Sequence, residues 1–507
     1  MSSVKQPIKA AINITNSIPQ EFKQIYHPYL PKYATSNTEK DQVVPTNSWI
    51  SNLFYPSLNN TAPTNSDPYT IRVLDTLVDG NPGLSITQQE IKETGSYQDS
   101  KSVNSTIATT MSDYLINGQT VEIRYSCEEW GKTKVSNQNN NNNITTQVIS
   151  WDHFGATIRL MSQKNAKKYI DFPIARGMAY VTAHYHDLTP HFFTQRAIVH
   201  INSDGPKEDQ NGNTIYHGKR FKIQFNDKEE SIFIIYALDG TLSLTFAGLS
   251  RLVAKKPYNG TIRIAKIPKK EDEPIFDHYK NAWATGGLVK WKENSYAIQW
   301  KTEGQGDPLI FAYPHHIQTL TNKITSIKLS SASKGKMTAV IGNTWIMNES
   351  TVLLTDLKDR DVKDDAATWF FPQHPKLNPQ VAQDVLKYLE MDIESDYHNT
   401  TNKNDNYFSG KALQKYALLA LILNQPNITG LYKPQLAQLA LDKIKNAFSV
   451  FLQNRQMDPF FYDVIYKGIV ARSGLPKSMG GTGNPGAAFG HTYYNDHHYH
   501  HGYLIVT

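Results

Sequence analysis

The sequence has few of the features that would assign the chain to a specialised class. Its 507 residues contain a single cysteine, Cys127, so no disulfide can form within the chain and packing alone must stabilise the fold. No stretch reaches the roughly 18 apolar residues that a membrane-spanning helix needs. The opening residues, MSSVKQPIKAAINITNS, also lack the apolar core of a signal peptide. No membrane partner is predicted, and a cytoplasmic location stays open alongside secretion.

Dense runs of Lys or Arg are also missing. The formal charge of +6 arises from 52 basic and 46 acidic residues spread along the chain. A surface that follows a polyphosphate backbone needs clustered positive charge, so no nucleic-acid partner is expected. Hydrophobic residues make up 39% and charged residues 19%, which predicts a globular chain rather than a disordered one. The length implies two to four domains, and we expect three.

The first half of the chain consists of short alternating apolar runs between turn residues. A period of two with frequent breaks is typical of antiparallel strands. We therefore predict a β-sandwich over residues 1–268. The clearest of these runs are residues 121–125, 221–225, 231–236, 242–246 and 261–264.

The spacing of apolar residues then changes in two steps along the chain. Strands are still expected at 309–313 and 337–341, and a helix is expected from Phe276 to Ala284, which predicts a small α/β linking domain over residues 269–365. After about residue 366 the apolar spacing becomes helical. Asn378 and Pro379 supply an N-cap and a first helical residue, residues 410–423 form a nearly all-apolar helix, and Pro434 begins a third. Helices at roughly 30-residue intervals favour hairpins stacked in a ring or solenoid over residues 366–507.

The most unusual segment is Phe489–Tyr503, which holds one carboxylate, five His and four Tyr. One interpretation is a metal site, since His497, His500 and His501 share a helix face. No His-Glu-x-x-His arrangement or second carboxylate accompanies these residues, so no metal and no cofactor are predicted. A second interpretation is a polar seam in which every His is hydrogen-bonded and none acts on a ligand.

In the third interpretation Asp496 is the general acid of a glycoside hydrolase. A carboxylic acid can deliver a proton near neutral pH only in surroundings that favour its neutral form. Partial burial among Tyr493, Tyr494 and Tyr499 would provide them, and His497 or His500 could orient the group. A second carboxylate must then lie about 6.5–9.5 Å away in an inverting enzyme and about 5–5.5 Å away in a retaining one.

Five motifs stand out along residues 45–507. They are Pro45-Thr-Asn-Ser-Trp-Ile-Ser-Asn-Leu-Phe54, Arg176-Gly-Met-Ala-Tyr-Val-Thr-Ala183, Leu309-Ile-Phe-Ala-Tyr-Pro-His-His316, Asp405-Asn-Tyr-Phe-Ser-Gly-Lys411 and Tyr494-Asn-Asp-His-His-Tyr-His-His-Gly-Tyr503. These motifs resemble those of family 81 of the glycoside hydrolases, the endo-β-1,3-glucanases that cleave laminarin. Their order along the chain is the family order, which makes the resemblance specific.

The resemblance implies an N-terminal β-sandwich, a small α/β domain and an (α/α)6 barrel that holds the cleft, with an inverting mechanism and no cofactor. Asp496 takes the general-acid role, and His500 is the nearby catalytic His. The expected substrate is β-1,3-glucan, and a monomer in the extracellular space or cell wall is expected. The remaining residues expected to bind substrate are Tyr407, Lys411, Tyr462, Asp463, Tyr494, Asn495, His497 and Tyr499. Lys411 and Asp463 also have structural alternatives, as an ion-pair partner and as a helix cap.

The chain departs from the family in one respect. The family's general base is a Glu roughly 70 residues beyond the acid, whereas Asp496 is followed by eleven residues. We expect the barrel to be incomplete and the base to lie outside this chain, so that the polypeptide alone hydrolyses glucan poorly. A non-catalytic glucan-binding protein is the alternative. A lyase or epimerase acting on uronate polymers is a third possibility.

Overall fold

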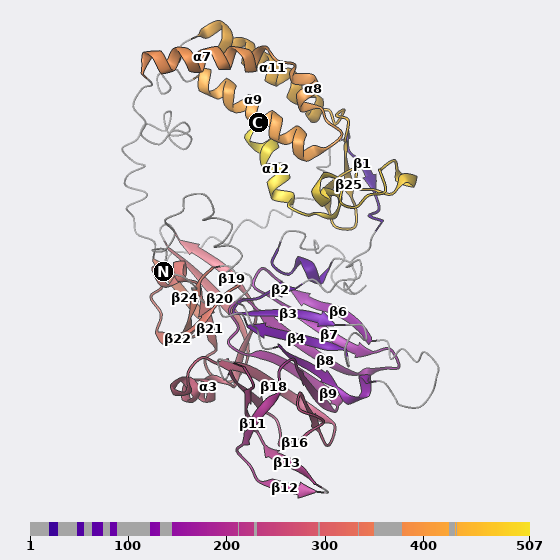
Figure 1. Cartoon of the computed structure of the whole chain (residues 1–507), viewed down its shortest axis with the longest axis vertical. Coiled ribbons are helices and arrows are strands. Elements are labelled where there is room, and N and C mark those ends of the chain that lie inside the picture. Colours follow the sequence, from indigo (N-terminus) through magenta and orange to yellow (C-terminus); the bar gives the residue numbers. More distant parts are fainter. Residues whose placement is uncertain are drawn as a thin grey trace. The chain divides into compact units, whose positions relative to one another are not determined.

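The computed structural model describes residues 20–28, 48–54, 63–74, 82–88, 122–131, 144–210, 212–227, 231–292, 295–332, 334–348, 378–424, 431 and 433–507. These residues form two compact units. In Figure 1 the colours follow the sequence from the N-terminus to the C-terminus. We call the described residues between 48 and 348 the β unit. The described residues 20–28 and 378–507 form the helical unit.

Two large antiparallel sheets form most of the β unit. The nine-stranded sheet has the order β12-β13-β16-β17-β10-β5-β4-β3-β2, and the eight-stranded sheet has the order β11-β14-β15-β18-β9-β8-β7-β6. The strands are β2 (Thr64–Asn65), β3 (Tyr69–Leu74), β4 (Gly83–Gln88), β5 (Glu122–Cys127), β6 (Ile144–Trp151), β7 (Gly155–Ser162), β8 (Asn165–Ala175), β9 (Val181–Leu188), β10 (Pro190–Thr194), β11 (Ile198–Ser203), β12 (Lys207–Gln210), β13 (Asn213–Gly218), β14 (Arg220–Phe225), β15 (Ile232–Ala237), β16 (Leu242–Phe246), β17 (Arg251–Ala254) and β18 (Tyr258–Ile267). Short 3-10 turns lie at η1 (Ser51–Leu53) and η2 (Glu128–Trp130).

Buried tyrosines connect these two sheets. The hydroxyl of Tyr125 in β5 donates to the carbonyl of Val181 in β9 at 2.7 Å, and Tyr185 of β9 donates to Ser126 of β5 at 2.9 Å. Along β14 every second side chain is buried, as a period of two requires. All five predicted strands of this region are confirmed to within three residues at either end, although Val121 lies outside the described residues.

The segment from 270 to 348 packs on the eight-stranded sheet. It contains η3 (Lys270–Asp272), α3 (Glu273–Tyr279), α4 (Pro314–Ile317), β19 (Ala282–Lys292), β20 (Ser295–Gly304), β21 (Leu309–Ala312), β22 (Ile324–Ser330), β23 (Lys336–Ile341) and β24 (Thr344–Asn348). Phe276 of α3, Ile234 of β15 and Phe311 of β21 share one hydrophobic core. Because of this shared core, the segment belongs to the same compact unit as the sheets, which differs from the separate linking domain expected at 269–365.

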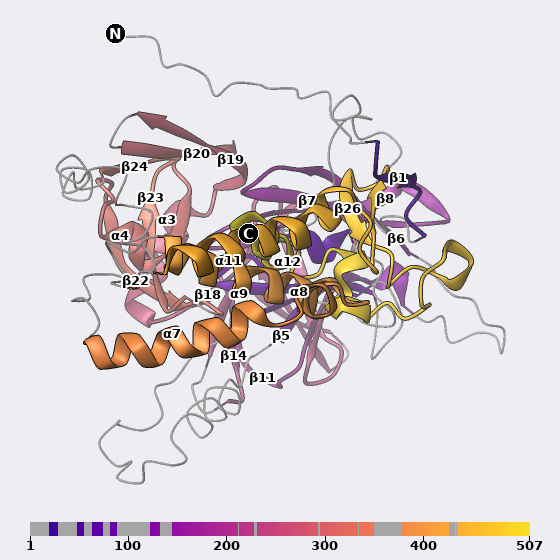
Figure 2. The same cartoon turned by 90° about the horizontal axis from the view of Figure 1, so that it is seen from above.

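The helix predicted from Phe276 to Ala284 is correct only as far as Tyr279. At Ala282 the chain enters β19, which pairs with β20, and Ala282 and Ala284 are both buried. Burial of every second residue is typical of a strand, whereas a helix would bury every third or fourth residue. Figure 2 shows β19, β20 and β24 as neighbouring strands.

Within the helical unit, the described residues form five α-helices and one small sheet. They are α7 (Pro379–Glu394), α8 (Tyr397–Thr401), α9 (Asn406–Asn424), α11 (Pro434–Leu452), α12 (His497–Val506), β1 (Lys23–Ile25), β25 (Phe460–Asp463) and β26 (Gly468–Ala471), with 3-10 turns η4 (Lys477–Met479) and η5 (Ala487–Tyr493). Helix α9 contacts both α11 and α12 (Figure 1). The predicted cap is confirmed, because the Asn378 side chain accepts a hydrogen bond from the Gln380 amide at 2.9 Å. None of the described helices has the length and apolar character needed to cross a bilayer.

The N-terminal strand β1 belongs to the helical unit. It pairs in parallel with β25, and Ile25 is buried there. The sequence placed residues 1–268 together in the sandwich, so this segment differs from the prediction. The reason is that backbone pairing with a strand more than 430 residues away leaves no local pattern in the sequence.

A close approach between α9 and α12 gives the first prediction. A Cβ atom on Gly410 would lie 3.0 Å from the Cβ atom of Tyr503, whereas nothing lies within 4 Å of the corresponding position on Gly502. Gly410→Val should therefore lower the stability of the helical unit by about 1–3 kcal/mol through overpacking. Gly502→Val is the matched control and should change it by less than about 1 kcal/mol. Calorimetric unfolding measures both, and equal effects would contradict the close packing.

Candidate active site

The predicted acid lies in a turn with unusual backbone geometry. Asp496 connects η5 to α12 with φ at 48°, and Ala488, Phe489 and Tyr494 have φ values of 47°, 55° and 63°. Non-glycine residues adopt this left-handed region infrequently. We call residues 487–496 the acid loop. Four such residues in one loop require the surroundings to impose the conformation.

The hairpin of β25 and β26 supplies much of this support. The backbone N–H of Ala471 donates to His491 Nδ1 at 3.1 Å, and Thr492 Oγ1 donates to the Ala471 carbonyl at 2.8 Å. The Tyr494 hydroxyl donates to the carboxylate of Asp463 at 3.0 Å. A Cβ atom on Gly468 would lie 2.4 Å from the Tyr494 ring, so glycine is required for this approach. The acid loop is thus held at several points along its length.

Asp496 itself is exposed to solvent. The expectation of partial burial among Tyr493, Tyr494 and Tyr499 is therefore wrong, because the residue occupies the open turn before α12. His500 contacts the backbone of Asp496 instead of its carboxylate: its Nδ1 lies 2.9 Å from the Asp496 carbonyl oxygen. Since a carbonyl only accepts, Nδ1 carries the hydrogen. The His500 backbone N–H bonds the same oxygen at 3.0 Å, so His500 fixes the turn that carries the acid.

Exposed aromatic rings gather next to this turn. We call Tyr407, Phe408, Phe489 and Tyr499 the aromatic group; the last three are 53%, 51% and 57% exposed. The Tyr407 ring lies 4.7 Å from Phe489 and 6.0 Å from Tyr499, nearly parallel to the latter, and Phe408 lies 6.0 Å from Phe489. These rings in mutual contact form a partly exposed apolar surface, in which only Tyr407 and Tyr499 are close to parallel.

Electrostatics connects the aromatic group to Asp496 and Lys411. Hydrogen bonds with Tyr503 and Tyr407 lower the pKa of Tyr499, the charge of Lys411 lowers it further, and the charge of Asp496 raises it. The ammonium group of Lys411 lies 5.9 Å from the Tyr407 ring centre. Predicted residues Tyr407, Lys411, Tyr499 and Asp496 are therefore brought together. Phe408 and Phe489 were missed, although both lie within segments that the sequence analysis singled out.

Three other residues that were predicted to bind substrate are buried. Tyr462, Asp463 and Tyr494 are all nearly inaccessible to solvent. Asp463 accepts from the Ile465 N–H at 2.8 Å as well as from Tyr494, which supports its structural alternative, as the cap of a turn rather than of a helix. Burial of these three side chains leaves almost no surface for direct contact with a polymer in this structure. Asn495 is exposed, and its side chain donates to the Phe489 carbonyl at 2.8 Å.

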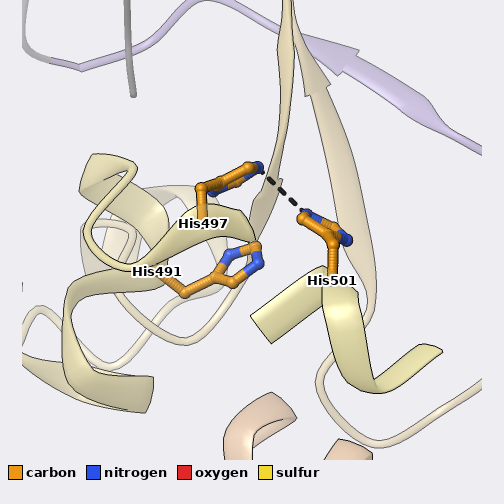
Figure 3. Close-up of side chains that lie close together, drawn as sticks. All are labelled: His491, His497 and His501. Atoms are coloured by element: carbon orange, nitrogen blue, oxygen red, sulfur yellow. Dashed lines mark hydrogen bonds between the residues drawn. The ribbon is translucent and has the colours of Figure 1, made fainter. Parts of the chain in front are cut away.

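A cluster of three imidazoles lies beneath the loop. His491, His497 and His501 each point one ring nitrogen into a shared space, with these nitrogens within 4.8 Å of one another (Figure 3). The Nε2 atoms of His497 and His501 are 3.0 Å apart. Burial lowers the pKa of His497 to about 3 and that of His501 to about 4, and it lowers the pKa of His491 well below its usual value. All three are neutral at pH 7.

The hydrogen bonds of this cluster do not suit a metal ion. His491 Nδ1 accepts from a backbone N–H, so the hydrogen of the neutral ring is on Nε2, the atom that would have to bind the metal through a lone pair. Metal-binding His residues normally donate their other N–H to an oxygen. The trio also differs from the one considered in the sequence, because His491 takes the place of His500.

Comparison with known proteins identifies the class of the chain as glycoside hydrolase. Residues 27–357 match the glycosyl hydrolase family 81 N-terminal domain, and residues 376–507 match the glycosyl hydrolase family 81 C-terminal domain. Together these matches cover most of the sequence. The chain belongs to glycoside hydrolase family 81.

Relatives agree with this assignment. A glucan endo-1,3-beta-D-glucosidase of Arthroderma benhamiae is 29% identical over 381 residues, which cover 72% of this chain and 39% of the relative. The primary septum glucan endo-1,3-beta-D-glucosidase of Schizosaccharomyces pombe is 29% identical over 349 residues, which cover 66% and 31%. The chain thus spans less than half the length of these relatives. A solved family 81 structure from Clostridium thermocellum shares the fold, with a TM-score of 0.59 at 14% identity over 96% of this chain and 58% of that chain.

The neutral imidazoles predict acid sensitivity. Below about pH 6.5 the unfolded chain binds protons on these His residues while the folded chain does not, so stability falls as the pH decreases. His497 and His501 should each contribute about 1.4 kcal/mol per pH unit between about pH 6.5 and 4. His501→Gln should make the melting temperature less dependent on pH over this range. The exposed His498→Gln is the control and should leave the slope unchanged; an identical slope in both variants would contradict the prediction.

Proposed function

We propose that this chain provides the acid-bearing part of an enzyme that hydrolyses internal β-1,3-glucosidic bonds in β-glucan. The observation that carries the proposal is an exposed carboxylate, Asp496, held in a constrained turn beside exposed aromatic rings. Two relatives are named as endo-1,3-glucosidases, which supports the same bond as the target. We further propose that the two large sheets form a β-sandwich, that residues 269–365 act as the linking region, and that the helices are the first part of an (α/α)6 barrel.

In this mechanism Asp496 protonates the glucosidic oxygen as the bond to the anomeric carbon breaks. The reaction inverts the configuration, because water attacks from the opposite face. The aromatic group packs against the apolar face of a glucosyl ring, and Lys411 and Asn495 contact its hydroxyls. His500 acts on the acid through the backbone of residue 496. Binding of the polymer covers the exposed carboxyl group and keeps bulk water away from the bond that breaks.

The catalytic base is proposed to lie outside the described residues. Asp405 accepts hydrogen bonds from the N–H groups of Tyr407 and Phe408, at 2.8 and 3.1 Å, and so caps α9. Asp458 is buried and accepts from Asn406 at 2.7 Å, and Asp463 is buried against Tyr494. These three carboxylates therefore have structural roles. We propose a Glu contributed by residues that follow Thr507 in a longer protein.

The proposed partner is the polysaccharide alone, with no cofactor, and the protein is proposed to act as a monomer in the extracellular space or cell wall. A non-catalytic glucan-binding protein is the second candidate. It is favoured by one observation, namely that the three neighbouring carboxylates are engaged in structural hydrogen bonds. The two candidates differ in whether Asp496 transfers a proton, and this difference can be measured.

A small anionic nucleophile can take the place of the water molecule that the base would activate. Residues 1–507 should release reducing sugar from laminarin slowly, because the absence of the base lowers the rate of hydrolysis by a factor of about 10² to 10⁴. Azide needs no base: its nitrogen bonds the anomeric carbon, the glucosidic oxygen leaves, and Asp496 supplies the proton to that oxygen. Added azide should therefore yield an inverted glycosyl azide, detected by mass spectrometry and NMR.

The acid role is tested by Asp496→Asn under the same conditions. Glycosyl azide formation should fall at least about 100-fold, while calorimetric binding of laminari-oligosaccharide stays within a few-fold. Asp442→Asn, an exposed carboxylate on α11, is the matched control and should keep full activity. Azide turnover that survives Asp496→Asn removes Asp496 from the acid role. Binding without turnover in every form would favour the glucan-binding alternative.

The aromatic group gives a separate prediction about binding. Phe489→Ala should weaken binding of laminari-oligosaccharide about 5- to 10-fold, the loss expected for one stacked ring of about 1–1.4 kcal/mol. Tyr388→Ala, an exposed aromatic residue on α7, is the control. Calorimetric titration measures both variants. Equal affinities for Phe489→Ala and the unaltered protein would exclude the aromatic group as a sugar platform.

A further inference from the structure

His27 lies beneath the acid loop although it comes from the other end of the chain. Its side chain is only 3% exposed, and its Nε2 atom is 2.9 Å from the carbonyl oxygen of Thr492, 465 residues away. A carbonyl oxygen accepts only, so Nε2 carries the hydrogen and donates it. The contact is within the helical unit.

The imidazole also packs against three tyrosine rings. The centre of the His27 ring lies 5.0 Å from Tyr466, 5.6 Å from Tyr493 and 6.2 Å from Tyr494. Tyr493 and Tyr494 belong to the acid loop, and Tyr466 follows β25. His27 therefore touches both the loop and the hairpin that supports it.

Backbone pairing fixes the position of His27. Residues 23–25 form β1, which pairs with β25, and the Val464 N–H donates to the Ile25 carbonyl at 3.0 Å. The side chain of Asn454 donates to the Glu21 carbonyl at 3.1 Å. The segment is thus anchored before the strand, at Glu21, and along it as far as Ile25, which fixes the position of His27 two residues further on.

The Thr492 carbonyl accepts its hydrogen bond from outside the loop, unlike the carbonyls of the two residues before it. The carbonyls of Gly490 and His491 accept hydrogen bonds from Asn495 and Tyr494, which closes the turn from within. The Thr492 carbonyl instead accepts from His27. Tyr494 and Asp496 directly afterwards have left-handed backbones, which persist only where the surroundings determine them.

We propose that His27 is a positioning residue for the acid loop, and that the N-terminal segment 20–28 is a working part of the catalytic unit. The hydrogen bond to Thr492 holds the turn in the conformation that presents Asp496, and the imidazole ring fills the space beneath Tyr493 and Tyr494. The catalytic consequence rests on the proposed function, whereas the effect on the loop does not.

Two substitutions separate the functions of the imidazole. His27→Phe keeps a ring of similar shape and removes the donor, while His27→Gln keeps an N–H donor without the ring. Tyr26→Ala changes the exposed neighbouring residue and is the matched control. Hydrogen exchange measured by mass spectrometry should be about tenfold faster for amides 490–496 in His27→Phe, as expected for the loss of one hydrogen bond that closes a local structure. His27→Gln should restore much of the protection, and exchange in α9 and α11 should be unchanged.

Turnover provides the second readout. Azide-dependent glycosyl azide formation should fall about tenfold in His27→Phe while the oligosaccharide affinity stays within a few-fold, because the altered stretch 490–496 orients the acid and the four rings of the aromatic group lie outside that stretch. Equal loss of protection across the whole helical unit would show a general stabilising role and overturn the proposal. Unchanged exchange at residues 490–496 would overturn it as well. If no form of the protein turns over glucan, the proposed function fails, and the exchange data still decide the role of His27.

A measurement on the unaltered protein covers the case in which His27→Phe does not fold. Nitrogen NMR of ¹⁵N-His-labelled protein, assigned by the missing signal in His27→Gln, reports which ring nitrogen carries the hydrogen. The proposal requires the Nε2–H form at neutral pH. A hydrogen on Nδ1 alone would overturn it, because the bond to Thr492 could then not exist.

Discussion

The geometry of the candidate site depends on one constraint: four non-glycine residues of the acid loop must remain in left-handed backbone conformations. Such conformations are unfavourable for residues with a Cβ atom, so the loop cannot hold them by itself. The hairpin β25–β26 imposes them through hydrogen bonds to His491 and Thr492, and Gly468 lets the Tyr494 ring lie directly on the strand. The position of the acid at the start of α12 is a consequence of this support.

The same constraint explains why so many polar side chains are buried around the loop. Asp463 bonds Tyr494 and the turn after β25, and Asp458 bonds Asn406 at the start of α9. These carboxylates connect segments that are far apart in the chain, and each is satisfied by several donors, as buried charge requires. In the proposed function, the chemistry is therefore assigned to the exposed groups. The surface of this region carries Asp496, Lys411 and the aromatic group. The buried His, Tyr and Asp side chains beneath it hold the loop in place.

Much of the local structure followed from residue patterns. Alternating runs identified five strands of the large sheets, and Asn378 with Pro379 marked the beginning of α7, because period and capping are properties of neighbouring residues. The pattern failed between Phe276 and Ala284, where a short helix ends and a strand begins within a few residues. It also failed at residues 23–25, whose partner strand is more than 430 residues away. Burial of Tyr462 and exposure of Asp496 were equally invisible, since both depend on packing between distant segments.

The sequence by itself determined the chemical content of the site: one Asp within a run of His and Tyr, five motifs in family order, and aromatic residues near the predicted acid. It could do so because residue type and spacing are written in the chain. Only the tertiary structure decided which of these side chains face water. Tyr407, Phe489 and Tyr499 gather around the turn, while Asp463 and Tyr494 are buried, and His27 reaches the loop from the opposite end of the sequence. These outcomes depend on long-range strand pairing and close helix packing, which bring together residues that no local pattern connects.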